Sequence, residues 1–441
     1  MPDQALLLIY SPKISSRSKY IFRLFFREML QLNFRLCSDI AEFTAYKGSK
    51  FSYAGQPVGE ELFFFAAGLL FESGIVVQEI SFSQCRGLPC FYPAKRKSAL
   101  PFDPFAAAFF LVSRYEEYLP HIKDEHGRFS STQSMASLHG FMQKPLVNIW
   151  AAWIQEILSQ HFPSIKLHQP VYRFIPTIDI DNAWAYKRKG FIRIGGGMIA
   201  DLLQFDFKKF RERTYTVLGM KDDPYDTYDY QVELIHRYQL EPIYFILMGD
   251  YATWDKNVPY QNKAFQSLIK FLADFGEVGI HPSYASNQEP LKLRLEINRL
   301  SGILHREIRS SRQHFLRINL PHTYQRLIDL DIRDDYTMGY PDQPGFRASI
   351  CTPFFFYDLD LEIETPLKLH PFCLMDGTLK DYMKLQPEET YPLITKLIDE
   401  VKAVRGEFIT IWHNESFAEN DRWKGWRKVY EFILDNAAVY E

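Results

Sequence analysis

The chain has 441 residues, more than one ordinary folded unit contains, and we expect two or three units. Its 51 Lys and Arg nearly balance 54 Asp and Glu, so the net charge of −3 provides no large positive field to hold nucleic acid or an anionic bilayer. Because the first residues lack a secretory signal and no apolar run approaches the ~20 residues of a spanning helix, we expect a cytoplasmic protein without a membrane span.

Residues 1–165 alternate strand-like and helix-like segments without an evident catalytic cluster, which predicts a smaller α/β or α+β domain. The polar run at residues 113–118 has two interpretations, because such a run either forms a solvated helix face with internal ion pairs or docks one domain on the other. The break at Phe162-Pro163-Ser164 marks the predicted boundary. Strands are predicted at residues 5–10 and 50–54, and helices at residues 19–32, 60–72, 105–118 and 145–161.

Residues 170–441 repeat an apolar strand, a loop and a helix, which predicts parallel strands joined by helical crossovers. This length suits an α/β fold of the distorted (β/α) barrel type, and a doubly wound open sheet is the alternative. The stretch 190–220 has three successive glycines without the dinucleotide-binding spacing, so we expect a loop there. Strands are predicted at residues 171–180, 242–248, 277–280, 312–318, 333–338 and 407–412, and helices at residues 228–238, 262–275, 289–309, 321–330, 387–405 and 423–436.

Polar side chains follow three of these predicted strands. Asp179 and Asp181 lie at the end of the first strand. His281 follows the third strand, and His413 follows the last. Taken singly, an Asp after a strand often caps the next helix, and a lone His often has a structural role. In parallel β/α folds the reactive groups lie at the carboxyl ends of the strands, so the occurrence of these residues at three strand ends favours one shared site.

The order of these motifs is similar to that of the polysaccharide deacetylase superfamily. The motifs are Asp-x-Asp at residues 179–181, Gly-x-His-Pro-Ser at 279–283, an arginine segment that begins at 312, and Ile-x-x-x-His at 409–413. The resemblance covers residues from about 170 to 436. It implies a distorted β/α barrel and a hydrolase that removes acetyl groups from amino sugars with a divalent metal, commonly zinc. Residues 1–165 are similar to a domain found ahead of such barrels in some bacterial proteins, for which no clear function is implied.

The resemblance implies a role for each motif residue. Asp179 is expected to be the general base. Asp181 and His281 are expected to bind the metal. Arg312 is expected to orient the base, and His413 is expected to be the general acid.

The chain departs from the family pattern at two motifs. The family usually has a second histidine four residues after His281, and this chain has Ala285 there. Ser283, His314 or water are the possible substitutes, and we select His314 as the third metal ligand because imidazole binds zinc far better than a hydroxyl does. The family's Arg-Pro-Pro-Tyr motif is replaced here by Arg312-Gln-His-Phe.

Two further residues are candidates for contact with a carbohydrate or glycan substrate. Arg347 follows a Pro-Gly turn, where it contacts glycan, orients a carboxylate or pairs with a surface acid. Trp412 precedes His413, and its ring is of the kind that packs against the C–H faces of sugars.

These residue types suit metal-dependent deacetylation. A catalytic zinc takes about three N or O ligands and keeps one open position for water, whose acidity it raises. Asp179 would accept the proton of that water, and protonated His413 would donate one to the leaving amine. Two other functions stay open. One is a barrel that binds a glycan or a partner without turnover, and the other is a glycoside hydrolase that uses two carboxylates such as Asp179 and Glu415.

Overall fold

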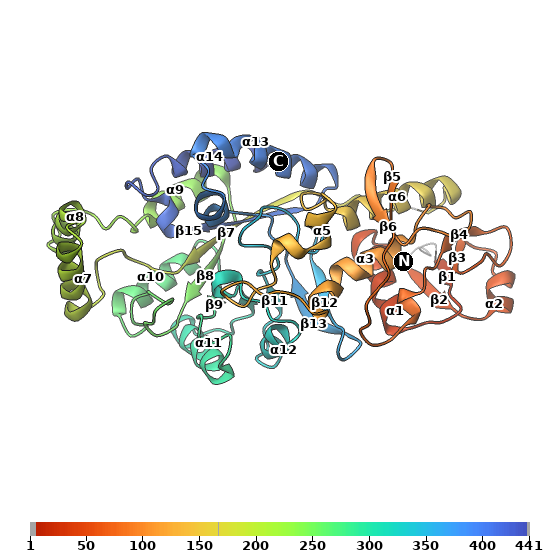
Figure 1. The fold of residues 1–441 in the computed structure, drawn as a ribbon, viewed down its shortest axis with the longest axis horizontal. Helices are drawn as coiled ribbons and strands as arrows, with labels where there is room; N and C mark the ends of the chain where they lie inside the picture. Colours follow the sequence, from red (N-terminus) through yellow and green to blue (C-terminus); the bar gives the residue numbers. More distant parts are fainter. Residues whose placement is uncertain (1–5, 166, 439–441) are drawn as a thin grey trace.

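The computed structural model describes residues 6–165 and 167–438 and has a mixed α/β architecture (Figure 1). A four-stranded sheet lies in the N-terminal part, and a nine-stranded sheet lies in the rest of the chain. Among the described residues no helix combines the length and the apolar character that crossing a membrane requires.

The four-stranded sheet is parallel and has the order β2-β1-β3-β4. Strand β1 is buried along its whole length, as expected for a parallel strand covered on both faces. The predicted strand at residues 50–54 matches β3, and the first residue of the strand predicted at 5–10 lies outside the described residues. The strands are β1 (Leu7–Tyr10), β2 (Phe34–Cys37), β3 (Lys50–Ala54) and β4 (Leu62–Phe65), and a separate antiparallel pair is formed by β5 (Phe82–Cys85) and β6 (Leu88–Phe91).

The prediction of a helix at residues 60–72 is wrong. The apolar run Leu62–Phe65 is strand β4, which pairs with β3, and a single 3-10 turn follows at Leu69–Phe71. A short buried apolar run fits a strand and a helix equally well by periodicity, and here the aromatic side chains favoured the strand. The remaining N-terminal helices are α1 (Ser16–Phe22), which continues as a π-helical stretch (Arg23–Met29), α2 (Ile40–Ala45), α3 (Pro104–Val112), α4 (Tyr115–Tyr118), α5 (Met135–Leu138) and α6 (Leu146–His161).

The nine-stranded sheet has the order β12-β13-β11-β10-β9-β8-β7-β15-β14. The paired strands run parallel except for β12 and β13, which form an antiparallel edge. Closure of this sheet into a barrel stays a prediction. The strands are β7 (Arg173–Ile180), β8 (Ile243–Leu247), β9 (Glu277–His281), β10 (Ser310–Ser311), β11 (Asp334–Asp335), β12 (Phe354–Asp358), β13 (Ile363–Leu369), β14 (Leu374–Met375) and β15 (Glu407–His413).

Helices connect these strands close to where the apolar periodicity predicted them. Helix α9 has the predicted bounds, and the others differ by a few residues at their ends. The helices are α9 (Tyr228–Tyr238), α10 (Lys263–Ala273), α11 (Pro290–Leu304), α12 (His322–Ile328), α13 (Pro387–Ala403) and α14 (Trp426–Ala437).

Two other predictions in this part are wrong. Residues 190–220 form a hairpin of α7 (Phe191–Leu203) and α8 (Phe207–Val217), although each glycine in a helix costs about 1 kcal/mol. The two helices are joined by an ion pair between the buried Asp201 of α7 and Arg213 of α8. Residues 312–318, predicted as a strand, are not in the sheet. The strand here is β10 (Ser310–Ser311), and a 3-10 turn with Phe315 and Leu316 at positive φ follows it. This early exit from the sheet leaves Arg312 and His314 at the end of β10.

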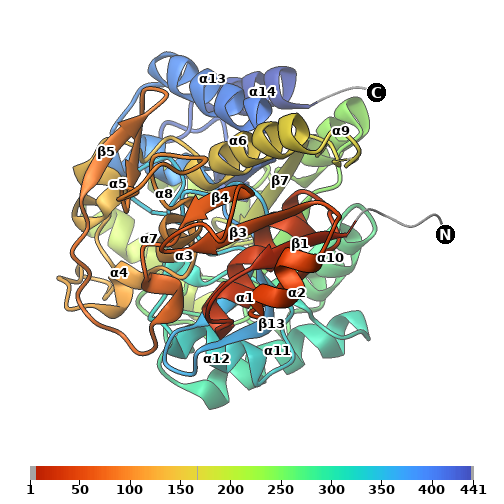
Figure 2. The same cartoon turned by 90° about the vertical axis from the view of Figure 1, so that its right-hand side faces the viewer.

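The N-terminal part packs closely against the nine-stranded sheet (Figure 2). The predicted helix at 105–118 breaks at Arg114, whose φ is 54°, into α3 and α4. Arg114 and Glu117 are buried rather than solvated, and both oxygens of Glu117 accept hydrogen bonds from Arg347, at 2.9 and 2.6 Å. The polar run therefore docks one part of the chain on the other, which is the second of the two interpretations.

Candidate active site

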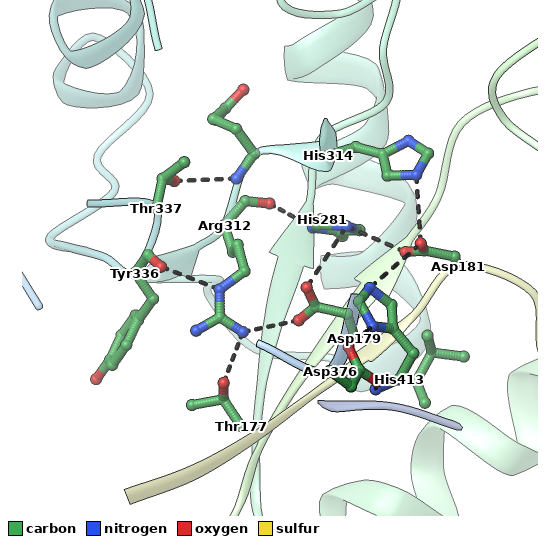
Figure 3. A network of polar contacts seen from close by, with 12 residues as sticks. Thr177, Asp179, Asp181, His281, Arg312, His314, Tyr336, Thr337, Asp376 and His413 are labelled. Atoms are coloured by element: carbon green, nitrogen blue, oxygen red, sulfur yellow. Dashed lines mark hydrogen bonds and ion pairs between the residues drawn. The ribbon is translucent and has the colours of Figure 1, made fainter. Parts of the chain in front are cut away.

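The carboxyl ends of neighbouring strands bring the predicted site residues together (Figure 3). Asp179 and Asp181 lie at the end of β7, between β8 and β15. His281 ends β9, and His413 ends β15. All four residues, together with His314, line one cavity of about 440 Å³.

Asp181, His281 and His314 form a group with the geometry of a metal site. Nε2 of His281 lies 3.1 Å from Oδ1 of Asp181, and Nε2 of His314 lies 3.4 Å from Oδ2 of the same carboxylate. One donor atom from each residue falls within 4.8 Å of the others. The buried Oδ1 of Asp181 receives no hydrogen bond from any described residue, so this oxygen is available to a cation.

The other nitrogen of each imidazole is held by an acceptor. Nδ1 of His281 donates to the carbonyl oxygen of Arg312 over 2.5 Å. Nδ1 of His314 donates to Oδ1 of Asp255 over 2.9 Å. These bonds place a proton on Nδ1 of both rings and turn Nε2 toward Asp181, as second-shell partners do for metal-binding histidines. Nε2 would offer its lone pair to a metal after losing its own proton. Two imidazoles and a carboxylate that leave a coordination position open are a donor set that fits catalytic zinc.

The charges in this group stabilise one another. Burial by itself raises the pKa of Asp181, but the imidazoles of His314 and His281 outweigh it and hold this pKa well below its usual range. Burial by itself lowers the pKa of His314, but Asp181 and Asp255 outweigh it and raise this pKa to about 9. The negative charge on Asp181 and Asp255 therefore favours a bound positive charge at this position.

Asp179 is held by an arginine. Nη1 of Arg312 donates to Oδ1 of Asp179 over 2.8 Å and to Oγ1 of Thr177 over 2.6 Å, and Nε donates to the carbonyl oxygen of Tyr336 over 3.0 Å. The guanidinium is fully buried and lies over the ring of Phe245. The other oxygen of Asp179 lies 3.8 Å from Nε2 of His281. One oxygen is thus fixed, and the other points toward the group around Asp181.

His413 is positioned by Asp376, a residue that the sequence reasoning missed. Nδ1 of His413 lies 2.8 Å from Oδ1 of Asp376, and the backbone N–H of His413 donates to Oδ2 over 2.8 Å. Ser416 also donates to this buried carboxylate. Burial lowers the pKa of His413, but Asp376 outweighs it, so this pKa is raised well above its usual range. Nε2 of His413 is left 3.7 Å from Oδ2 of Asp181. Asp376 follows the two-residue strand β14, too short to be recognised by periodicity.

The cavity wall also contains residues that are distant in the sequence from the strand ends of the site. Glu125 and Arg128 come from the N-terminal part. Arg128 donates to the carbonyl oxygen of Phe315 over 2.8 Å and to the hydroxyl of Tyr382 over 3.2 Å. No sequence signal marks these residues, because only packing of the N-terminal part on the sheet brings them to the cavity. Other lining residues are Asp381, Glu415, Arg422 and Trp423.

Two residues that were predicted to contact substrate do not line the cavity. Arg347 is 1 % exposed and paired with Glu117, so its charge is used between the two parts of the chain. Trp412 is fully buried, and its ring packs against Tyr430 and Trp426. Successive side chains of a strand point to opposite faces, so Trp412 faces the helices while His413 faces the cavity.

Ala285 and Ser283, where the second motif differs from the family pattern or offers a substitute ligand, lie beside the site. Ala285 and Ser283 line a separate small cavity. The hydroxyl and the backbone N–H of Ser283 both bind Glu296. Ser283 is therefore engaged elsewhere, and His314 is the residue that joins Asp181 and His281.

Comparisons with known proteins match parts of this architecture. A family of unknown function, DUF7033, matches residues 7–163. No protein among the curated sequences matches the chain.

Solved structures that resemble the chain include carbohydrate deacetylases. A provisionally assigned polysaccharide deacetylase from Mycobacterium smegmatis is 13 % identical with a TM-score of 0.39, over 62 % of this chain and 88 % of that one. The carbohydrate deacetylase Agd3 is 9 % identical with a TM-score of 0.38, over 98 % and 83 %. A CE4 family pseudoenzyme from Bacillus anthracis is 10 % identical with a TM-score of 0.28, over 60 % and 62 %. At such low similarity, function has to be inferred from the site itself.

Proposed function

We propose that the chain is a metal-dependent hydrolase that removes acetyl groups from an acetylated sugar or glycan. The observation that supports this function is the composition of one cavity. It combines a two-imidazole, one-carboxylate donor set with a carboxylate fixed by an arginine and a histidine fixed by a second carboxylate.

Asp181, His281 and His314 would hold a divalent cation such as zinc. When bound, such a cation would acidify a water molecule and polarise the carbonyl oxygen of the acetyl group. Asp179 would take the proton of the attacking water with the oxygen that faces His281, while Arg312 keeps the carboxylate in place.

His413 would protonate the leaving amine or alkoxide. Its Nε2 faces the Asp181 group, and Asp376 keeps the imidazole protonated and oriented. The acid and the base are thus held by separate buried partners, Asp376 for His413 and Arg312 for Asp179.

The substrate would be recognised by the exposed part of the wall. Tyr382 is 44 % exposed and offers a ring of the kind that packs on sugar faces. Asp381 and Arg422, which pair over 3.0 Å, and Glu125 offer charged groups for hydroxyls. The cavity of about 440 Å³ suits one or two sugar rings better than a long buried chain.

Metal analysis of single variants tests the ligand set. Asp181→Ala and His281→Ala should each lose stoichiometric zinc or cobalt after loading, because each removes one of three donors. The control is His322→Ala, which removes an exposed histidine of α12. Full metal occupancy in both site variants would refute the ligand assignment.

The proposed base is tested separately. Asp179→Asn should keep the metal and the hydrogen bond from Arg312 but lose acetate release by roughly 10²-fold or more, because a general base contributes that much. Undiminished turnover would remove Asp179 from this role.

A glycoside hydrolase is the second candidate, since Glu415 also lines the cavity. Burial raises the pKa of Glu415, as suits a carboxylic acid that protonates a leaving oxygen. Activity on a glycosidic bond that is insensitive to chelators and lost in Glu415→Gln would favour this candidate. A chain that binds glycan but takes up no metal would instead be a binding barrel.

A further inference from the structure

The helical hairpin α7–α8 concentrates exposed apolar side chains. The hairpin follows β7 in the chain and extends to one end of the molecule, at the left of Figure 1. Of the 24 large hydrophobic side chains that are exposed in the described part of the chain, ten lie within residues 191–220. Among them Phe191 is 96 % exposed and Ile192 is 92 % exposed. An apolar patch of this kind marks an interaction site.

The exposed residues follow the geometry of the helices. Ile192, Ile199 and Leu203 are seven and four residues apart, so they lie along one stripe of α7. Phe205 and Phe207 continue the patch through the turn into α8, where they are 79 % and 63 % exposed. The patch thus runs along one helix and around the tip of the hairpin.

The same segment is strongly basic, although the chain as a whole has a net charge of −3. Residues 187–221 contain nine Lys and Arg against three Asp and Glu, a formal charge of +6. Two acids, Asp222 and Asp223, follow directly and reduce it to +4. Burial lowers the pKa of Lys189 to about 7, which leaves eight other basic side chains. The even balance of the whole chain therefore hides a local positive region.

The acidic residues of the hairpin are already engaged. Asp201 is buried and pairs with Arg213 over 2.6 Å. Asp206 caps α8 by accepting the backbone N–H of Lys209, and Glu212 pairs with Lys221 over 2.8 Å. Nζ of Lys209 also lies 3.7 Å from Asp201. The three acids of residues 187–221 are therefore already engaged within the segment, and an excess of six basic side chains remains.

We propose that the α7–α8 hairpin binds the surface of an anionic lipid bilayer. Amphipathic helices that combine exposed Phe and Leu with Lys and Arg lie in the interface of such membranes, where apolar burial and attraction to anionic headgroups add together. This inference does not depend on the proposed deacetylase activity.

A second copy of the chain is the competing occupant of this patch. Two hairpins that packed on each other would bring two regions of like charge together, which opposes association, whereas an anionic surface attracts both. The charge therefore favours the bilayer.

The hairpin also contacts the rim of the catalytic cavity. Lys208 pairs with Asp421, and the next two residues, Arg422 and Trp423, line the cavity. Docking of the hairpin would hold this rim close to the membrane surface.

Co-sedimentation of the full chain with lipid vesicles tests the proposal. The chain should bind vesicles that contain about 30 % phosphatidylserine and bind pure phosphatidylcholine at least tenfold more weakly, and added salt should weaken the binding. Phe205→Gln/Phe207→Gln and Lys209→Gln/Arg211→Gln should each reduce binding at least tenfold. All four side chains are exposed, so these changes leave the folded structure intact.

Leu291→Gln is the matched control, because Leu291 is 82 % exposed but lies on α11. It should bind anionic vesicles like the parent chain. Absence of binding to anionic vesicles, or equal loss in the control, would overturn the proposal. A concentration-dependent dimer that Phe205→Gln/Phe207→Gln abolishes, without vesicle binding, would assign the patch to a second copy instead.

Discussion

At the scale of single residues, the site depends on partners that hold each reactive side chain. Arg312 holds Asp179, Asp255 holds His314, and Asp376 holds His413. All three partners are buried, so each interaction is stronger than the same pair would be in water. The reactive groups are therefore placed by a surrounding shell that sequence motifs do not show.

Asp376→Asn tests this shell. The carboxylate raises the pKa of His413, so its loss should lower that pKa and move the alkaline limb of the kcat/KM profile to lower pH. We also expect kcat to fall on the order of 10²-fold while metal content stays unchanged. Asp331→Asn, at a side chain that is 90 % exposed, is the control. A lower kcat with an unshifted pH profile would mean that Asp376 does not act through the pKa of His413.

At the scale of elements, close packing around the central strands sets the geometry of the cavity. Gly279 lies in β9 two residues before His281. A Cβ added there would lie 2.7 Å from the carbonyl oxygen of Ser310 and 2.8 Å from the ring of Phe245. Neither neighbour can move without shifting the sheet, so only glycine fits between these strands.

Gly279→Ala should lower the free energy of unfolding by roughly 1–3 kcal/mol, the usual cost of overpacking. Gly302→Ala is the matched variant, because Gly302 lies in α11 and no heavy atom is within 4 Å of its added Cβ. This change should stabilise the chain by about 0.5–1 kcal/mol through helix propensity. Urea denaturation of both variants measures the two effects, and equal behaviour would contradict this view of the sheet.

At the scale of the whole molecule, a buried ionic cluster joins the N-terminal part to the sheet. Glu117 accepts hydrogen bonds from Arg347 and from Arg114, whose Nε lies 2.7 Å away. Burial by itself raises the pKa of Glu117, but the two guanidinium groups outweigh it and lower this pKa to about 2. The guanidinium of Arg114 also lies 6.0 Å from the ring of Phe129, which follows the cavity-lining residue Arg128 in the chain.

This pKa predicts a dependence of stability on acid. A depressed carboxyl pKa stabilises the fold above the unfolded value of about 4.5, and this contribution of about 3 kcal/mol is lost as the pH falls toward 2. Glu117→Gln should remove this dependence and lower the free energy of unfolding at pH 7 by roughly 3–5 kcal/mol, because two buried arginines lose their partner.

The matched control is Glu42→Gln, which breaks an exposed pair with Arg35 and should cost less than about 1 kcal/mol. Denaturation at pH 7 and at about pH 2.5 measures both variants, because most of the contribution is lost between about pH 4.5 and 2. Equal losses in the two variants, or an unchanged acid dependence in Glu117→Gln, would show that this cluster does not stabilise the docking.

The sequence alone determined the alternation of strands and helices after residue 170 and the convergence of Asp179, Asp181, His281 and His413. Both follow from local rules, because apolar periodicity sets the elements and the carboxyl ends of parallel strands share one edge. Only the tertiary structure decided that Asp376 and Arg128 reach the cavity, that Arg347 pairs with Glu117, and that the stretch with three glycines is a helical hairpin. Those outcomes depend on contacts between residues that are distant in the chain, such as the pair of Asp201 with Arg213 in the hairpin, and a short stretch of sequence does not show such contacts.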